Sequence, residues 1–269
     1  MTGEIKDSAR NTEINRRSLL AGVAAMPLAS ILASPALAQM SAATTTEVSI
    51  NSARLGVPLK ASLCVPDVTP APAVILIHEW WGLNDQIKSV GAELAKLGYL
   101  ALSIDLYDGQ VATDADTAMK LLGDVQEDAG VDTVQSWVKW LRQHEACNDN
   151  VAVMGWCFGG GWSLETAIET DVDASIIYYG RVTAPQERLA SISGPVMGHF
   201  AILDQFIDKP MVNGFVANMQ AVDKDLTIHW YEADHAFANP TSARYDDTDA
   251  ALSWQRTLDF LKAHLRAED

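Results

Sequence analysis

The residue best suited to chemistry in this chain is Cys157. Residues 155–159 read Gly-Trp-Cys-Phe-Gly and directly follow an apolar run at residues 151–154. The pattern is typical of a nucleophile elbow, where a strand turns sharply into a helix and small neighbours let the central side chain project. The unpaired N–H groups and positive dipole end of that helix favour a thiolate and an oxyanion. We therefore expect a cysteine nucleophile, the alternative being a buried, inert thiol before a glycine-rich helix start.

Such a nucleophile needs a carboxylate and then a histidine, each in a loop after a later strand. The apolar segment 194–202 leads to Asp204, and the expected strand 226–231 leads to His235. We predict that Asp204 is the orienting acid and His235 the base. Asp208, four residues further along, is better explained as the cap of the following helix.

The other five histidines have plainer explanations. His229 and His199 fall within expected strands, and His144 and His264 lie at helix ends, where a cation suits the dipole. His78 ends another expected strand and could help shape a pocket, although a structural role is the simpler interpretation.

From residue 44 onward, strand-like runs alternate with helical patterns, as a parallel sheet with crossover helices requires. The expected strands are residues 46–51, 58–65, 73–78, 99–105, 150–155, 174–179, 195–202 and 226–231. Apolar stripes at 134–141 and 254–265 mark two helices that pack on a core. A single α/β domain of this length can bury a large core.

Residues 1–38 have the three parts of an export signal. They contain Arg16-Arg17, then an Ala/Leu-rich stretch, then Ala-Leu-Ala at 36–38. The paired arginines predict export by the twin-arginine machinery to the periplasm or the medium. An uncleaved anchor is the alternative, but two prolines and several Ser and Ala residues make the stretch weakly apolar for a bilayer span. We expect a mature domain at 39–269, with no membrane attachment after cleavage.

The chain is strongly acidic, with a formal charge of -16. Removal of residues 1–38 would leave 15 basic against 32 acidic residues, a charge of -17. A surface of this sign repels phosphate backbones and anionic membranes. Nucleic acid is therefore excluded as an expected partner, and a small molecule is expected instead.

The remaining cysteines raise the question of a disulfide. Cys64 lies in an expected strand and Cys147 in an expected loop, and the two could pair after export, although nothing in the sequence brings them together. The chain has no CxxC, HExxH or clustered carboxylate motif. We therefore predict neither a metal nor a cofactor.

Five segments together resemble the dienelactone hydrolase family, and the likeness extends over about residues 46–265. They read His-Glu-Trp-Trp-Gly-Leu-Asn at 78–84, Asp-Leu-Tyr at 105–107, Gly-Trp-Cys-Phe-Gly-Gly at 155–160, Leu-Asp-Gln-Phe at 203–206 and Tyr-Glu-Ala-Asp-His-Ala-Phe at 231–237. The resemblance implies the α/β-hydrolase fold, a mostly parallel twisted sheet flanked by helices.

The resemblance also implies site roles. Glu79 corresponds to a carboxylate that approaches the thiol and helps to remove its proton once substrate is bound. A free thiol with a pKa near 8.5 is only about 3% ionised at neutral pH. The plainer interpretation of Glu79 is a carboxylate on a surface turn. The backbone N–H groups of Phe158 and Trp80 would form the oxyanion hole.

Four aromatic side chains are expected to bind substrate: Trp81, Tyr107, Trp156 and Phe237. They would form an apolar lining, although such rings could equally belong to the core. A departure from the family pattern concerns charge. Lactone-cleaving members hold the substrate carboxylate with arginines where this chain has Gln110 and Asn239. Arg181 and Arg244 are the nearest alternatives, and each is better explained as a surface charge.

Three functions are open at this point. The first is a cysteine hydrolase that cleaves lactones or enol esters through a Cys-His-Asp triad and a thioester. The second is an exported carboxylesterase of broad specificity with the same triad. The third is a catalytically silent α/β-hydrolase scaffold that binds a small apolar ligand or a partner.

Overall fold

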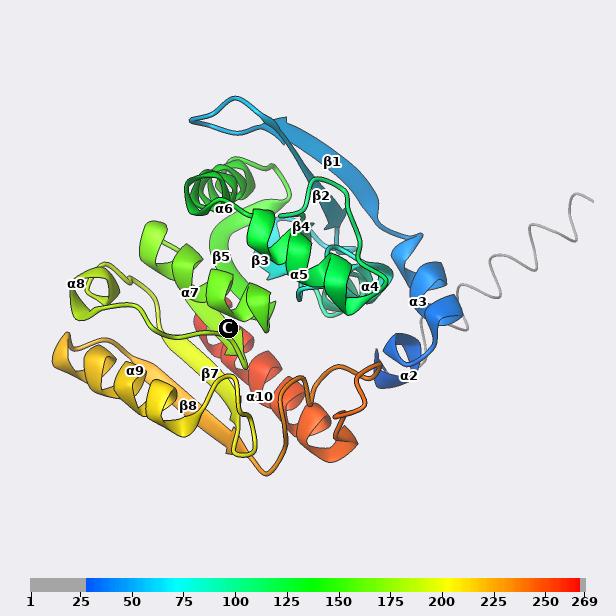
Figure 1. Cartoon of the computed structure of the whole chain (residues 1–269). Helices are drawn as coiled ribbons and strands as arrows, with labels where there is room; N and C mark the ends of the chain where they lie inside the picture. Colours follow the sequence, from blue (N-terminus) through cyan, green and yellow to red (C-terminus); the bar gives the residue numbers. More distant parts are fainter. Residues whose placement is uncertain (1–27, 267–269) are drawn as a thin grey trace, which may run out of the picture.

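Runs of aliphatic residues form the strands of one eight-stranded sheet (Figure 1). The computed structural model describes residues 28–266. The strands are β1 (Thr46–Asn51), β2 (Pro58–Cys64), β3 (Ala71–Ile77), β4 (Leu100–Ile104), β5 (Cys147–Trp156), β6 (Ala174–Tyr178), β7 (Val196–Ala201) and β8 (Leu226–Tyr231). They lie in the order β1-β2-β4-β3-β5-β6-β7-β8, with β2 antiparallel to both neighbours and the other pairs parallel. The predicted α/β-hydrolase fold is confirmed.

Each expected strand is present, with small shifts at its ends. One placement was wrong, because Cys147 begins β5 and does not lie in a loop. It pairs with Ala71, and a register shift separates this pair from the regular pairing that starts at Ala73 and Val151. The intervening polar residues hid the start of the strand, since pairing with β3 overrides their low strand propensity.

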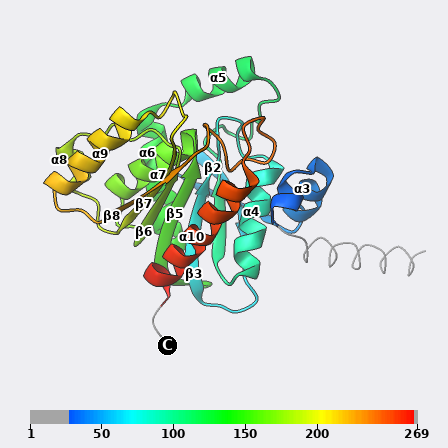
Figure 2. The same ribbon diagram turned by 90° about the horizontal axis from the view of Figure 1, so that it is seen from below.

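Helices cover both faces of the sheet. They are α2 (Leu28–Leu32), α3 (Pro35–Ala42), α4 (Asp85–Lys96), α5 (Ala115–Asp124), α6 (Glu127–Arg142), α7 (Phe158–Glu169), α8 (Gln186–Leu189), α9 (Lys209–Ala221) and α10 (Asp247–Leu265). Figure 2 shows α6, α7, α8 and α9 on one side and α4 and α10 on the other. As predicted, Asp208 caps α9 by accepting a hydrogen bond from the Met211 N–H at 2.9 Å.

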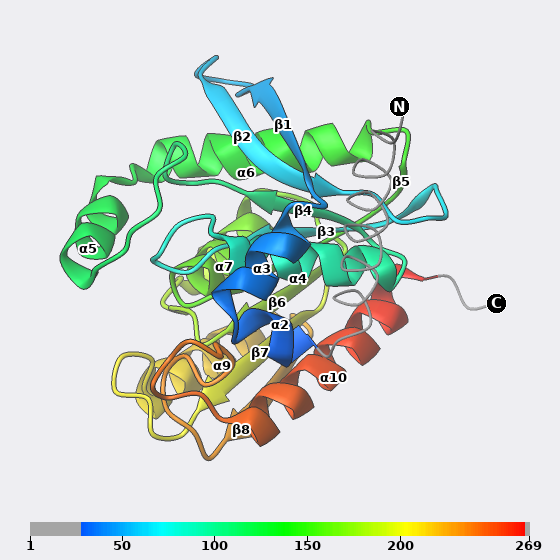
Figure 3. The same cartoon turned by 90° about the vertical axis from the view of Figure 1, so that its right-hand side faces the viewer.

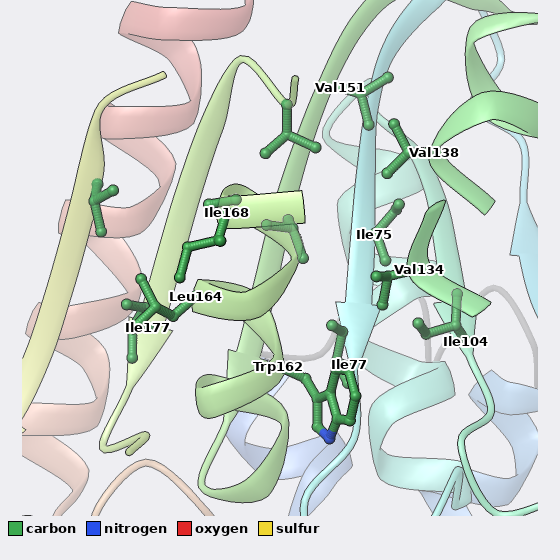
Figure 4. Packing of buried hydrophobic residues seen from close by; sticks show 14 of the residues in the cluster. Ile75, Ile77, Ile104, Val134, Val138, Val151, Trp162, Leu164, Ile168 and Ile177 are labelled. Atoms are coloured by element: carbon green, nitrogen blue, oxygen red, sulfur yellow. The ribbon is translucent and has the colours of Figure 1, made fainter. Parts of the chain in front are cut away.

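The two faces of β3 build the two halves of the core. All of its side chains are buried, as expected for a parallel strand covered on both sides. Ile75 and Ile77 belong to the cluster that contains Val134 and Val138 of α6 (Figure 4). The alternate residues of β3 pack with α4 and α10. Packing on both faces thereby fixes the position of the central strands relative to α7.

Helices α2 and α3 pack against α4 (Figure 3). Ile31 and Ala38 are each only 1% exposed. The structure therefore gives residues 28–42 a defined place, although the export signal was predicted to end at residue 38. The paired arginines of that signal lie outside the described residues, and its cleavage stays a prediction. Between residues 28 and 266, none of the helices has the length and apolar character that a membrane span requires.

The parallel strands bring the chemically interesting segments to one edge. The carboxyl ends of parallel strands meet on the same side of a sheet, where ligands bind in open α/β folds. The segments after β3, β5, β7 and β8 begin with His78, Cys157, Ile202 and Glu232. The predicted site residues therefore emerge along this edge although they are far apart in the sequence.

The turn from β5 into α7 is too tight for side chains at its flanks. An added Cβ at Gly155 would lie 2.0 Å from the carbonyl oxygen of Gly159, and one at Gly159 would lie 2.2 Å from the carbonyl oxygen of Ile77. Because the obstructing atoms belong to the backbone, rotation of a side chain cannot relieve the overlap. The start of α7 is thus pressed against the end of β3.

Gly155→Ala is expected to destabilise the protein by at least about 3 kcal/mol, because α7 must move to admit the methyl group. Urea denaturation followed by circular dichroism measures the change. The matched control is Gly214→Ala in α9, where no heavy atom lies within 4 Å of the added Cβ apart from the adjoining backbone of the helix itself. Helix propensity predicts a gain of about 1 kcal/mol there. Equal stability of the two variants would show that the elbow tolerates a side chain.

Candidate active site

Cys157 sits at the tip of the elbow between β5 and α7. Its backbone has φ +52° and ψ −113°, a conformation that residues with a Cβ rarely adopt. Such strain costs about 1–3 kcal/mol and is typical of functional positions. The Cys157 N–H donates to the carbonyl oxygen of Tyr178 at 2.9 Å, which ties the tip to β6. The side chain is partly buried, so the sulfur is held in place and still reachable.

The structure brings the predicted acid, base and thiol into contact. Nδ1 of His235 lies 2.7 Å from Oδ2 of Asp204, and Nε2 lies 3.2 Å from Sγ of Cys157. The other carboxylate oxygen of Asp204 accepts hydrogen bonds from the N–H groups of Phe206 and Ile207 at 2.8 and 3.0 Å. Three donors therefore fix the carboxylate, which fixes the imidazole ring.

Asp204, His235 and Cys157 form a contact row, in which the charged groups stabilise one another. Burial alone would lower the pKa of His235, but its hydrogen bonds to Asp204 and Cys157 raise that pKa to about 10. Burial alone would raise the pKa of Asp204, but the bond from His235 and the two backbone donors lower it overall. At neutral pH the ring is therefore a cation between a carboxylate and the sulfur. The protonated ring can donate one hydrogen bond to the carboxylate and one to the sulfur at the same time.

Glu79 is a buried residue of the same site, which excludes its interpretation as a surface turn carboxylate. It is only 7% exposed. Oε1 accepts a hydrogen bond from the Tyr179 hydroxyl at 3.2 Å, and Oε2 accepts one from Nδ2 of Asn239 at 2.5 Å. Burial raises the pKa of Glu79 despite these two donors and the nearby His235. Glu79 is thus a buried carboxyl group held by neutral donors.

His78, the first residue after β3, holds the backbone of Glu79. His78 is fully buried, and its Nε2 accepts a hydrogen bond from the Leu106 N–H at 3.2 Å. Nδ1 is then the protonated nitrogen and donates to the carbonyl oxygen of Glu79 at 2.6 Å. Burial lowers the pKa of His78, which keeps the ring neutral. The structural role expected for His78 is thus to join the Leu106 N–H to the carbonyl oxygen of Glu79.

The two residues predicted for the oxyanion hole lie on neighbouring elements. Phe158 is the first residue of α7, so its N–H takes no part in the helical hydrogen bonds. Trp80 follows β3, which pairs with β5. Since Gly159 packs directly on the end of β3, these two backbone positions lie on neighbouring parts of the edge. Their role as oxyanion donors stays a prediction.

The four predicted aromatic lining residues divide into three environments. Trp81 is partly buried and packs against Trp80 with ring centres 4.8 Å apart. Tyr107 is buried beside Phe158, and its hydroxyl has no hydrogen-bond partner. Trp156 packs on Tyr178 within the core on the α4 and α10 side.

Phe237 was predicted to line the substrate site, but it is fully buried in that same core. Its ring packs against Tyr231 and Tyr179 with centres 4.8 and 5.4 Å apart. The loop after His235 turns back over the sheet, so the side chain two residues later points inward. Phe237 therefore supports the loop from below and is not placed to line an open pocket.

Positive charge is missing where the resemblance would have it. Asn239 carries the neutral donor to Glu79 described above, and Gln110 bonds to the carbonyl oxygen of Tyr107 at 3.4 Å. Arg244 pairs with Asp234 at 3.3 Å and is 48% exposed, and Arg181 is exposed beside Thr183. The two arginines are surface charges, as expected.

Tyr179 is the site residue that the sequence analysis missed. It was assigned to the end of a strand, whereas β6 ends at Tyr178 and Tyr179 has φ +36°. Its ring lies edge-on to His235 with centres 5.2 Å apart, and its hydroxyl reaches Glu79. A polar aromatic residue before Gly180, at the carboxyl end of a central strand, was the available signal.

All three cysteines are unpaired, so the structure contains no Cys64–Cys147 disulfide. Burial raises the pKa of Cys64 to about 12, which leaves it an inert thiol at neutral pH. Across residues 28–266, no group of three or more His, Cys, Asp or Glu side chains is arranged to hold a metal ion.

Comparison with known proteins gives concordant matches. The model of the dienelactone hydrolase family matches residues 59–265. Carboxymethylenebutenolidase from Pseudomonas putida is 30% identical over 211 residues, covering 73% of this chain and 87% of the relative. A protein named probable 2-oxo-3-(5-oxofuran-2-ylidene)propanoate lactonase from Bradyrhizobium sp is 31% identical over 221 residues, covering 76% and 89%. The structure of a dienelactone hydrolase-like promiscuous phosphotriesterase from metagenomic libraries has a TM-score of 0.73 at 22% identity, covering 83% and 100%.

The raised pKa of His235 predicts how stability depends on pH. An unfolded histidine has a pKa near 6.5, so the stabilisation is complete below about pH 6.5 and is lost as pH rises towards 10. The free energy of unfolding should fall across this interval by at most about 5 kcal/mol from this group. Urea denaturation at a series of pH values measures the slope.

Asp204→Asn should flatten this slope, because the amide oxygen still accepts a hydrogen bond but carries no charge. Asp208→Asn is the matched control, since asparagine caps a helix as well as aspartate. It should keep the wild-type slope. Identical slopes for wild type and Asp204→Asn would contradict the assignment of the imidazolium to this row.

Proposed function

The chain belongs to the dienelactone hydrolase family, and on that premise we propose that it cleaves lactone or enol-ester bonds through a Cys157–His235–Asp204 triad and a thioester intermediate. The observation that carries the proposal is the position of the His235 ring, with one nitrogen at the Asp204 carboxylate and the other at the Cys157 sulfur. A hydrolase acting on lactone or ester bonds is also what the named relatives are.

The first half of the proposed cycle forms the thioester. The Cys157 sulfur attacks the carbonyl carbon, and a C–S bond forms while the carbonyl π electrons move to oxygen. The N–H groups of Phe158 and Trp80 receive this oxyanion, where each donor contributes about 3 kcal/mol. The oxyanion then collapses, the C–O bond to the leaving oxygen breaks, and that oxygen takes the proton from Nε2 of His235. In a lactone the same step opens the ring.

The second half releases the acid. Neutral His235, held in one tautomer by Asp204, takes a proton from water as the water oxygen attacks the thioester carbon. The tetrahedral intermediate collapses with cleavage of the C–S bond, and the sulfur leaves as the thiolate beside the protonated ring. The enzyme returns to the charge distribution of its resting state.

The thiol proton of Cys157 passes to His235 and not directly to Glu79, because the His235 ring contacts the sulfur. Glu79, which the resemblance implies as the group that removes this proton, is bonded to Tyr179 and Asn239 instead. It would reach the thiol only after releasing Asn239. A substrate that displaces the Asn239 amide would therefore free Glu79 for this role.

The proposed substrate class follows from the neutral Asn239 amide, which stands where the resemblance implies an arginine. A carboxylate-bearing lactone would find neutral Asn239 where the resemblance implies arginine, beside the buried carboxyl group of Glu79. Trp80 and Trp81 are partly buried. The neutral amide and the partly buried indole rings favour a neutral, apolar ester or lactone, whereas the buried Tyr107 hydroxyl is not exposed to a substrate. The amide and the rings also favour the second candidate, a carboxylesterase of broad specificity that uses the same triad.

Export is a further part of the proposal. The paired Arg16-Arg17, the apolar stretch and the Ala-Leu-Ala sequence support twin-arginine export and a periplasmic or secreted enzyme. The partners would be the export machinery for the precursor and a small ester or lactone for the mature enzyme.

Cys157→Ala should lower kcat on an activated ester by at least about a thousandfold, because no thioester can form. In His235→Gln, an acyl adduct on Cys157 should form slowly and accumulate, since an activated leaving group departs without a proton whereas deacylation lacks its base. Intact-protein and peptide mass spectrometry detect the adduct. Cys147→Ala is the matched control, as Cys147 is partly exposed but distant from the row, and it should leave kcat unchanged. Full activity in Cys157→Ala would contradict the proposal, whereas a wild-type protein without ester or lactone hydrolysis would favour the silent scaffold.

Asn239→Arg tests the charge argument. It should raise kcat/KM for a carboxylate-bearing lactone relative to its methyl ester by about tenfold, equivalent to about 1.4 kcal/mol. Asn239→Gln keeps a neutral amide and should leave this ratio at the wild-type value. The same panel, extended to simple acyl esters, separates the two enzyme candidates. A wild-type preference for lactones below about tenfold would favour the carboxylesterase.

A further inference from the structure

A cavity of about 300 Å³ lies beside the site, on the face of the sheet covered by α4 and α10. Its walls are mainly apolar and aromatic and include Ile87, Val90, Trp156 and Trp254. The side chains of Cys157 and His235 do not line it. It is therefore a space separate from the position where the thiol would meet a carbonyl group.

One end of this cavity reaches the second carboxyl group of the site. Glu79, Tyr179 and Asn239 all belong to its walls, and they are linked by the hydrogen bonds at Glu79. A molecule in the cavity would lie against the Asn239 amide and the Glu79 carboxyl group from the side away from the triad. Ligand pockets combine an apolar body with a few polar groups at one end in this way.

Helix α2 covers another part of the cavity wall. Leu28, Ala29 and Leu32 complete the cavity wall, and Leu32 is 9% exposed. Nε2 of Gln86 donates to the carbonyl oxygen of Leu32 at 3.0 Å, which fixes the end of α2 on α4. Helix α2 has only five residues, of which Ile31 and Leu32 are buried. It covers part of the cavity without filling the interior.

The predicted cleavage after residue 38 would remove this cover. All three α2 side chains in the wall precede the cleavage position, whereas Ile87, Val90 and Trp254 stay with the mature domain. The cavity would then become a groove open to solvent between α4 and α10. An apolar groove of this kind lowers its free energy by binding an apolar molecule.

The walls also restrict the charge of the ligand. Of the described residues, those lining the cavity include Glu79 and Glu93 and contain neither lysine nor arginine. An anion would be repelled by both carboxyl groups. Glu93 already pairs with Lys96 at 3.0 Å, and a hydrated cation would lose its water against mainly apolar walls. A neutral molecule is the remaining class.

We propose that this cavity is a second binding site, for a small neutral apolar molecule with a carbonyl or hydroxyl group at one end, and that α2 covers it in the precursor. The polar end of the ligand would meet Asn239 and Glu79, and the apolar body would lie between α4 and α10. This site shares Glu79 and Asn239 with the proposed active site, but Cys157 and His235 do not line it.

The test uses the full chain, with its mass verified, and the neutral naphthalene ketone prodan as the probe. Leu28→Asp with Leu32→Asp places two charges in the α2 wall and should detach the helix, because buried unpaired charges are costly. Prodan should bind this opened variant saturably, one molecule per chain, at least about tenfold more tightly than the wild type. The blue shift of its fluorescence measures binding. Met119→Asp with Leu122→Asp, on exposed positions of α5, is the matched control and should show no gain.

A cavity-filling change decides whether the probe occupies this site. Ala251→Trp, added to the opened variant, should abolish prodan binding and leave hydrolysis of an activated ester unchanged, because Ala251 lines the cavity and lies outside the triad. Binding is read without turnover, so failure here and failure of the proposed hydrolysis are separable. The proposal is overturned by no gain on opening, by binding that survives Ala251→Trp, or by equal binding of an anionic naphthalene sulfonate. If circular dichroism shows that the double variant does not fold, Leu28→Asp alone replaces it.

Discussion

The site depends on the contact of the first turn of α7 with the ends of β3 and β6. An added Cβ at Gly160 would lie 2.7 Å from the carbonyl oxygen of Tyr178, and one at Gly159 would meet the carbonyl oxygen of Ile77. With no side chains in the way, the amino end of a helix reaches the middle of the sheet edge. Cys157 takes up the sharp change of direction in its own backbone, at φ +52°. The sulfur consequently lies within reach of loops from distant strands.

Two carboxyl groups near one histidine have pKa values pushed in opposite directions. Asp204 receives three hydrogen bonds, one of them from the histidine ring, and its pKa is lowered. Glu79 receives two hydrogen bonds from neutral groups, and burial raises its pKa. Opposed shifts of this kind separate a carboxyl group that loses its proton easily from one that keeps it more readily. Asp204 therefore suits the fixed orientation of His235, and Glu79 suits a step that takes up a proton.

The sequence predicted the strands and the three residues of the contact row. Cys157, Asp204 and His235 each follow an apolar run, and the carboxyl ends of parallel strands must share an edge. Side-chain direction was harder to predict. Trp156 ends β5 two residues after Met154, and alternate strand residues share a face, so both side chains enter the core on the α4 and α10 side. Phe237 points inward because its loop folds back, and loop geometry leaves no periodic signal in the sequence.

The sequence showed that Asn239 stands where the resemblance implies an arginine. It did not predict the contact of Asn239 with Glu79. A buried carboxylate without a cation is unfavourable unless its pKa rises or donors satisfy it. Here both occur, so Glu79 persists without the ion pair that the resemblance implies. The same arrangement changes what can bind. A substrate carboxylate would be opposed by Glu79 and by a protein of net charge -16, whereas a neutral acyl group meets only hydrogen-bond donors and rings. Discrimination against anions thus follows from several groups acting together, and a single added arginine would have to overcome all of them.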